Sequence, residues 1–187
     1  MSLQTTSSQT IGPYLHIGTT WLVTEDLTAP GVTGERVAIE GRVLDADRQP
    51  VVDAMVEVWQ ANAHGRYAHP DDTRDLPLEV GFSGFGRSQT DEQGRFRFTT
   101  IKPGRVPGAD GRPQAPHLSV TIFMRGILKH LITRMYFPDD PANAGDAVLG
   151  LVPGARRATL IARATKPGVV AWEVILQGDG ETVFFEC

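Results

Sequence analysis

Short segments of alternating polar and apolar residues, separated by turns rich in glycine and proline, run through most of this chain. The clearest are VAIEGRVL at residues 37–44, AMVEVWQ at residues 54–60 and RFRFT at residues 95–99. A period of two places successive side chains on opposite faces, which is the pattern of a half-buried β-strand. Further strands are expected at residues 117–124, 131–136, 159–164, 169–177 and 182–185. Many short strands of this kind predict an all-β fold, an antiparallel β-sandwich.

The N-terminal residues lack this alternation. Residues 1–15 contain Gly12-Pro13 and are expected to form an extended arm. The remainder, residues 16–187, is expected to form one sandwich domain. Helix signals are sparse, and the best candidate for a short helix is the segment 141–149.

Two long loops are expected in the sandwich, at residues 70–86 and 103–116. Both are rich in glycine, proline and aspartate. Loops of this length in a compact domain are more often functional or interface-forming than idle.

The composition excludes several classes of protein. The 187 residues are 41% hydrophobic and 21% charged, as in a globular domain with an ordinary core. The net charge is -4 and no run of Lys or Arg exceeds two residues, which indicates no nucleic-acid partner. No apolar stretch has the length of a membrane span, and residues 1–10 lack the apolar region of a signal peptide. With Cys187 as the single cysteine, the chain is expected in the cytoplasm.

Five longer segments follow one another in a fixed order. They are SQTIGPY (8–14), EVWQANAHGRY (57–67), GRSQTDEQGRFRFTTIKPG (86–104), HLITRMYFPDDPAN (130–143) and QGDGETVFFE (177–186). Together they resemble the intradiol ring-cleaving dioxygenases, in which two tyrosines and two histidines hold a non-haem ferric ion. The ordered set is specific, whereas the T-D-x-x-G-x-F pattern alone occurs in other β-sandwich domains.

The resemblance places the four iron ligands of that family at Tyr67, Val106, His117 and Ser119. Only Tyr67 and His117 keep a usable donor. Ferric iron requires anionic oxygen donors, and a tyrosinate depends on the metal to keep its deprotonated form. The iron-binding chains also carry an arginine three residues before the first histidine, where this chain has Gln114. The resemblance therefore implies that this chain holds no metal and that these four positions are vestigial.

In the two-chain members of the family, one chain binds iron and the other lends residues to its partner's pocket. The SQTIGPY segment and the segment FMRG at 123–126 are typical of the iron-free chain. The resemblance implies Fe3+ on a homologous beta chain in a large hetero-oligomer, with a catechol acid and dioxygen as substrates. The arm at residues 1–15 is then expected at the interface with that partner.

Five residues are expected to bind substrate: Arg125, Thr10, Gly12, Pro13 and Tyr14. A guanidinium such as that of Arg125 can grip the ring carboxylate of the substrate. In the arm, glycine allows close backbone approach, proline stiffens the segment, and tyrosine offers a ring and a hydroxyl. The simpler interpretations are that Arg125 is a surface residue paired with a carboxylate and that the arm only packs on a neighbouring chain.

Two other functions remain open. The chain would be a self-sufficient iron enzyme if His64 or His69 joined Tyr67 and His117 as ligands. It would be a non-enzymatic binding module if it belonged with the transthyretin-like domains, which share the T-D-x-x-G-x-F pattern. Those domains have no need of SQTIGPY or HLITRMYFPDDP, and both segments weigh against that interpretation.

Overall fold

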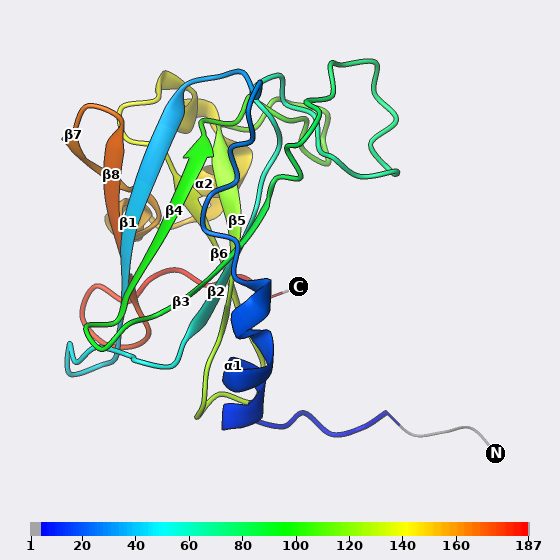
Figure 1. The fold of residues 1–187 in the computed structure, drawn as a ribbon. Helices are drawn as coiled ribbons and strands as arrows, with labels where there is room; N and C mark the ends of the chain where they lie inside the picture. Colours follow the sequence, from blue (N-terminus) through cyan, green and yellow to red (C-terminus); the bar gives the residue numbers. More distant parts are fainter. Residues whose placement is uncertain (1–4, 187) are drawn as a thin grey trace.

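Two four-stranded sheets face each other in a sandwich (Figure 1). The computed structural model describes residues 5–186, so the first part of the expected arm and Cys187 lie outside the described residues. One sheet has the order β4-β1-β8-β7 and the other β3-β2-β5-β6. The strands are β1 (Arg36–Leu44), β2 (Met55–Trp59), β3 (Phe85–Gln89), β4 (Arg95–Ile101), β5 (His117–Phe123), β6 (Leu131–Tyr136), β7 (Arg163–Lys166) and β8 (Val169–Ile175).

The predicted β-sandwich is confirmed, with most of its strands at the expected positions. One pair departs from the antiparallel pattern, because β1 and β8 run parallel. The prediction of a strand at 159–164 is wrong over most of its length, since the 3-10 helix η3 (Gly154–Leu160) ends within it and β7 begins only at Arg163. No strand covers 182–185 either; Phe185 forms only an isolated bridge to Ile132. Strand β3 was not expected, because FGRSQ has too few apolar residues to alternate.

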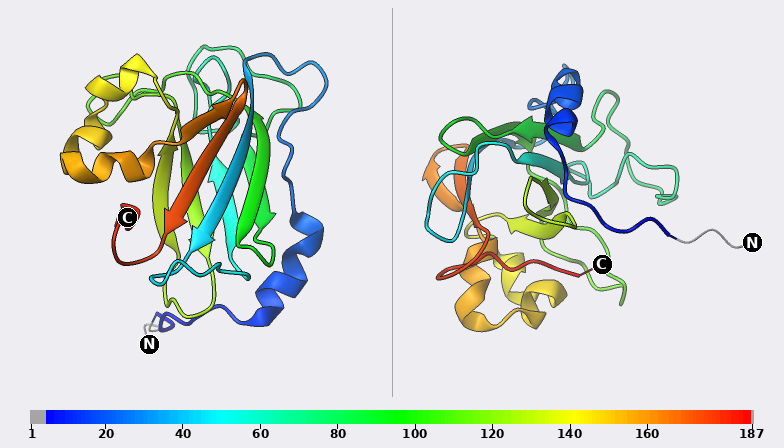
Figure 2. Two further views of the ribbon diagram at one scale, coloured as in Figure 1. Left: turned by 90° about the vertical axis from the view of Figure 1, so that its left-hand side faces the viewer. Right: turned by 90° about the horizontal axis from the view of Figure 1, so that it is seen from below.

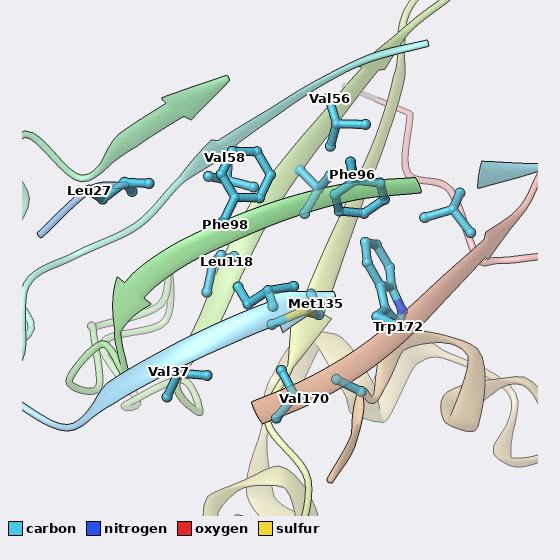
Figure 3. Packing of buried hydrophobic residues seen from close by; sticks show 14 of the residues in the cluster. Leu27, Val37, Val56, Val58, Phe96, Phe98, Leu118, Met135, Val170 and Trp172 are labelled. Carbon is cyan, nitrogen blue, oxygen red and sulfur yellow. The ribbon is translucent and has the colours of Figure 1, made fainter. Parts of the chain in front are cut away.

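A hydrophobic core fills the space between the sheets (Figure 3). Alternate residues of β2 and β5 point inward, among them Val56, Val58 and Leu118, and meet Phe98 and Trp172 from the opposite sheet. The intervening residues of β2 and β5 therefore point to the outer face of their sheet, where most are only half-buried.

The N-terminal arm is shorter than expected. Helix α1 (Pro13–Thr19) begins at Pro13 and continues into the 3-10 helix η1 (Thr20–Leu22), so the part without regular structure ends at Gly12 rather than at residue 15. Proline suits the first position of a helix, because its fixed φ is helical and its missing N–H has no partner to lose there. In Figure 1 the helix lies at one end of the sandwich, beside the turn between β5 and β6.

A second cluster of helices covers one flank of the sandwich (Figure 2, left). The predicted helix at 141–149 is present as the 3-10 helix η2 (Pro141–Gly145) and the helix α2 (Ala147–Leu151). Asp146 caps α2 by accepting hydrogen bonds from two backbone N–H groups. Leu149 and Leu160 close a smaller core against Tyr136 at the end of β6. Within residues 5–186, no helix has the length and apolar character needed to cross a membrane.

Candidate functional site

The predicted site residues form two groups at opposite ends of β5. His117 begins the strand, whereas Arg125 follows its end at Phe123. At about 3.3 Å per residue, His117 and Phe123 are roughly 20 Å apart. Figure 1 shows the same separation, with the long loops gathered at one end and α1 at the other.

The first group is the degenerate site, defined by Tyr67, Val106, His117 and Ser119. A tight turn held by Asn62 presents Tyr67, because Asn62 Oδ1 accepts hydrogen bonds from two backbone N–H groups of that turn. Gly65 in the turn has φ +78°, and a Cβ there would lie 2.1 Å from the carbonyl oxygen of Arg105. Only glycine allows this approach, which brings the turn against the loop that carries Val106.

Tyr67 is packed as an ordinary half-buried phenol. Its ring stacks on Trp59 with centroids 5.8 Å apart and an angle of 9° between the planes. Its backbone N–H donates to Asp72, whose carboxyl pKa is held far below its usual range by hydrogen bonds from Arg74. Burial raises the pKa of the Tyr67 phenol above its usual value, against a lowering by the Arg134 charge. Tyr67 is therefore protonated at neutral pH. It borders a hollow of about 720 Å³ that Trp59 and Val106 also line.

His117 is buried and neutral. Its Nδ1 lies 2.8 Å from the carbonyl oxygen of Ala115, and because a carbonyl only accepts, Nδ1 carries the proton. Burial, with a smaller contribution from the Arg134 charge, lowers the pKa of His117 to about 4. The ring lies 5.6 Å from that of Tyr136.

Ferric iron does not fit the degenerate site. Val106 is 4% exposed and places an apolar side chain where an anionic donor is needed. Ser119 offers a neutral hydroxyl. Only Tyr67 and His117 remain as donors, which is half of the ligand set that the family implies.

The histidines of the alternative site do not complete a ligand set. His64 Nε2 pairs with Glu79 at 3.4 Å. His69 borders the same hollow as Tyr67, but its Nδ1 accepts a hydrogen bond from the backbone N–H of Asp71. Among the described residues, no three His, Cys, Asp or Glu side chains are grouped so that they could hold a metal ion.

The neutral state of His117 predicts a pH dependence of stability. Because its folded pKa is about 4, against about 6.5 in the unfolded chain, only the unfolded chain takes up this proton between those values. The contribution of neutral His117 to the free energy of unfolding is fully present above pH 6.5. It is lost as the pH falls toward 4, by at most about 1.4 kcal/mol per pH unit. His117→Gln is expected to flatten the free energy of unfolding across this window, measured by urea titration. The exposed His130 supplies the control variant His130→Gln, which is expected to keep the native slope. Equal slopes in the two variants would contradict this account.

The second group, the Arg125 corner, consists of Thr10, Gly12, Pro13 and Arg125. The Thr10 hydroxyl accepts a hydrogen bond of 3.0 Å from the backbone N–H of Gly126, which ties the arm to the turn after β5. Gly12, Pro13 and Arg125 border a mostly apolar hollow of about 340 Å³. The structure therefore brings together four of the five predicted substrate-binding residues.

Two features of the corner differ from the expectation or add to it. Tyr14 is 83% exposed and does not line the hollow. Arg125 Nε donates to the carboxylate of Asp53, which borders the same hollow. In the chain by itself Arg125 is thus paired with a carboxylate, and 65% of its side chain remains exposed.

Comparison with known proteins places the chain in a family. A family model described as Dioxygenase matches residues 22–178. The protocatechuate 3,4-dioxygenase alpha chain of Burkholderia cepacia is 45% identical over 201 residues, covering 99% of this chain and 98% of that relative. The beta chain of the same organism is 47% identical over 133 residues, covering 70% of this chain and 56% of the relative. The structure of hydroxyquinol 1,2-dioxygenase from Pseudomonas putida DLL-E4 matches with a TM-score of 0.61 and 25% identity, over 81% of this chain and 58% of that chain. The chain belongs to the intradiol ring-cleaving dioxygenases.

Family membership decides between the open classes of function. An oxidoreductase of the dioxygenase class is supported both by the family model and by the named relatives. The interpretation as a transthyretin-like binding module loses its basis, because the match extends far beyond the T-D-x-x-G-x-F segment.

Proposed function

We propose that this chain is the iron-free alpha subunit of a protocatechuate 3,4-dioxygenase, whose ferric iron is held by a homologous beta chain. The assembled enzyme would cleave protocatechuate with dioxygen to 3-carboxy-cis,cis-muconate. The relatives named as alpha and beta chains support a two-chain enzyme. The degenerate site carries the proposal, because its valine and serine stand at two of the four ligand positions implied by the family.

The proposed task of this chain is to shape the substrate pocket of its partner. The hollow of the Arg125 corner lies at the surface, and no residue of the degenerate site lines it. A guanidinium there supplies a partner for the substrate carboxylate, and the arm limits the access of water. In this role the chain binds and orients substrate, and the metal chemistry belongs to the beta chain. We propose that Tyr14 joins the corner in the assembly, where its exposed ring would meet the partner.

Co-expression tests the proposal directly. This chain is produced with a homologous chain that carries both tyrosines and the His-x-His pair, and oxygen uptake with protocatechuate is measured together with muconate formation. We expect turnover from the two chains together and none from this chain alone. Turnover by this chain alone would instead support a self-sufficient enzyme.

A methyl group added at Gly12 separates a pocket role from a packing role. Gly12 has φ -88°, and a Cβ there meets no atom within 4 Å, so Gly12→Ala is expected to leave the free energy of unfolding within about 0.5 kcal/mol of the native value. If Gly12 faces substrate in the assembly, the methyl group enters the pocket and lowers kcat/KM about tenfold. Steady-state kinetics on the two-chain enzyme measures this. Gly154→Ala in η3, where a Cβ also meets nothing, is the matched control and is expected to change neither quantity. Native kinetics for Gly12→Ala would remove this residue from the pocket.

A further inference from the structure

Arg134 lies beside one of the missing ligand positions. Trp59, Ser119 and Arg134 are direct partners across β2, β5 and β6. Directly opposed residues of antiparallel strands send their side chains to the same face of the sheet, with Cβ atoms about 5 Å apart. The Arg134 side chain therefore starts next to Ser119, on the face that carries the degenerate site.

Neutral groups hold the guanidinium in place. Its Nη1 donates to Gln114 Oε1 at 2.6 Å and to the hydroxyl of Tyr136 at 3.4 Å. Within residues 5–186, Arg134 forms no ion pair. Its position is thus fixed by hydrogen bonds to neutral groups rather than by an ion pair.

The carboxylates that act on Tyr67 and His117, Asp72 and Asp146, accept hydrogen bonds from other groups. Asp72 accepts hydrogen bonds from the guanidinium of Arg74 and from a backbone N–H of the Tyr67 turn. Asp146 accepts from the backbone N–H of Ala115, from two N–H groups of α2 and from a tyrosine hydroxyl. Asp72 is thus paired with Arg74, whereas Asp146 accepts only from neutral donors and is separated from Arg134 by the Tyr136 hydroxyl, which contacts both. Among residues 5–186, neither carboxylate forms an ion pair with Arg134.

The charge lies close to both surviving donors of the site. Arg134 Nη1 contacts the hydroxyl of Tyr136, whose ring lies 5.6 Å from that of His117. Trp59, which stacks on Tyr67, is the strand partner of the same Ser119 that pairs with Arg134. The Arg134 charge lowers the pKa of both donors, whereas Asp72 raises that of Tyr67 and Asp146 raises that of His117. A guanidinium keeps its charge at any pH at which the chain is folded. Since partly buried charges are screened less than exposed ones, a metal ion between Tyr67 and His117 would meet a fixed like charge.

We propose that Arg134 is a metal-excluding residue: its guanidinium places a permanent positive charge at the degenerate site, so that restoring the two missing ligands is not sufficient for ferric iron to bind. The inference rests on the proposed iron-free function and extends it. Loss of ligands removes the affinity for metal, and Arg134 opposes any cation that the remaining donors attract.

The test restores the two missing iron ligands in chains that keep the positive charge at position 134 and in chains that lack it. Val106→Tyr and Ser119→His are combined in the full-length chain, and Arg134 is left unchanged, changed to Lys, or changed to Gln. Ferric iron affinity is measured by chelator competition, with iron per chain and the tyrosinate-to-iron absorption band as readouts. We expect Arg134→Gln to bind iron at least tenfold more tightly than the unchanged and Arg134→Lys backgrounds, which both keep the positive charge. A thermal unfolding transition in each variant establishes that it is folded, and Arg134→Met replaces Arg134→Gln if the latter does not fold.

The same affinity in all three backgrounds, including no binding in any of them, would overturn the inference. Variants that fold only with the partner are assayed in the complex, where Arg134→Gln is expected to add a second iron per pair of chains. The native chain serves as the independent reference. Iron bound by the native chain would contradict the proposed function itself, whereas the three variant backgrounds test only the role of Arg134.

Discussion

Replacing Arg125 with alanine in the assembled two-chain enzyme is expected to lower kcat/KM for protocatechuate about 100-fold, mainly through KM. A hydrogen-bonded ion pair between a guanidinium and the substrate carboxylate contributes about 2–3 kcal/mol, which corresponds to a change of this size. The free energy of unfolding is expected to change by less than about 1 kcal/mol. The Arg125–Asp53 pair that the substitution removes is an exposed one, and such pairs contribute little to stability.

Two control variants make this result specific. Arg125→Lys keeps the charge but loses the planar fork, so it is expected to recover part of the affinity for substrate. Arg112 is likewise an exposed arginine paired with an aspartate, Asp110, but lies in the loop at the other end of the sandwich. Arg112→Ala is expected to leave the kinetics unchanged. Native kinetics for Arg125→Ala would assign Arg125 to surface pairing alone.

Asp146→Ala is expected to destabilise the chain by about 3–4 kcal/mol, because a buried charge with several partners is removed. The Asp146 side chain caps α2 and accepts hydrogen bonds from the backbone N–H of Ala115 and the hydroxyl of Tyr136. Loss of a helix cap costs about 1 kcal/mol, and each buried donor left without an acceptor adds about 1–3 kcal/mol. Urea unfolding of the chain measures the total.

The matched control is Asp91→Ala. Asp91 also accepts two backbone hydrogen bonds, from Gln93 and Arg95, but in an exposed turn where water replaces it. Its loss is expected to cost less than about 1 kcal/mol. If Asp146→Ala were no more destabilising than Asp91→Ala, the buried network around Tyr136 would contribute little to stability.

The sequence predicted the sandwich because its strands bury one face. Residues 131–136 became β6 without any shift, and the alternation of residues 95–99 became the start of β4. The alternating pattern predicted strands wrongly where both faces of a segment are buried or where neither face is. Residues 159–164 lie at the junction of η3 and β7, and the pattern of burial there comes from the second core, which local periodicity does not reveal.

The two site groups were predictable to different degrees. The four degenerate positions follow from a resemblance in sequence, and the Arg125 corner assembled as expected around Thr10 and Gly12. Asp53 was missed as the partner of Arg125, since the two lie far apart in sequence and meet only through the pairing of β2 with β5. In the sequence, Arg134 could be recognised only as an outward-facing residue of a strand. Its contact with Gln114 depends on a loop whose course the sequence does not specify.

The iron content of the native chain, purified without its partner from cells supplied with iron, tests the central claim most directly. The account predicts substoichiometric iron and no visible tyrosinate-to-iron absorption, because Val106 and Ser119 leave only Tyr67 and His117 as donors. Stoichiometric ferric iron with that absorption band in the native chain would contradict the account.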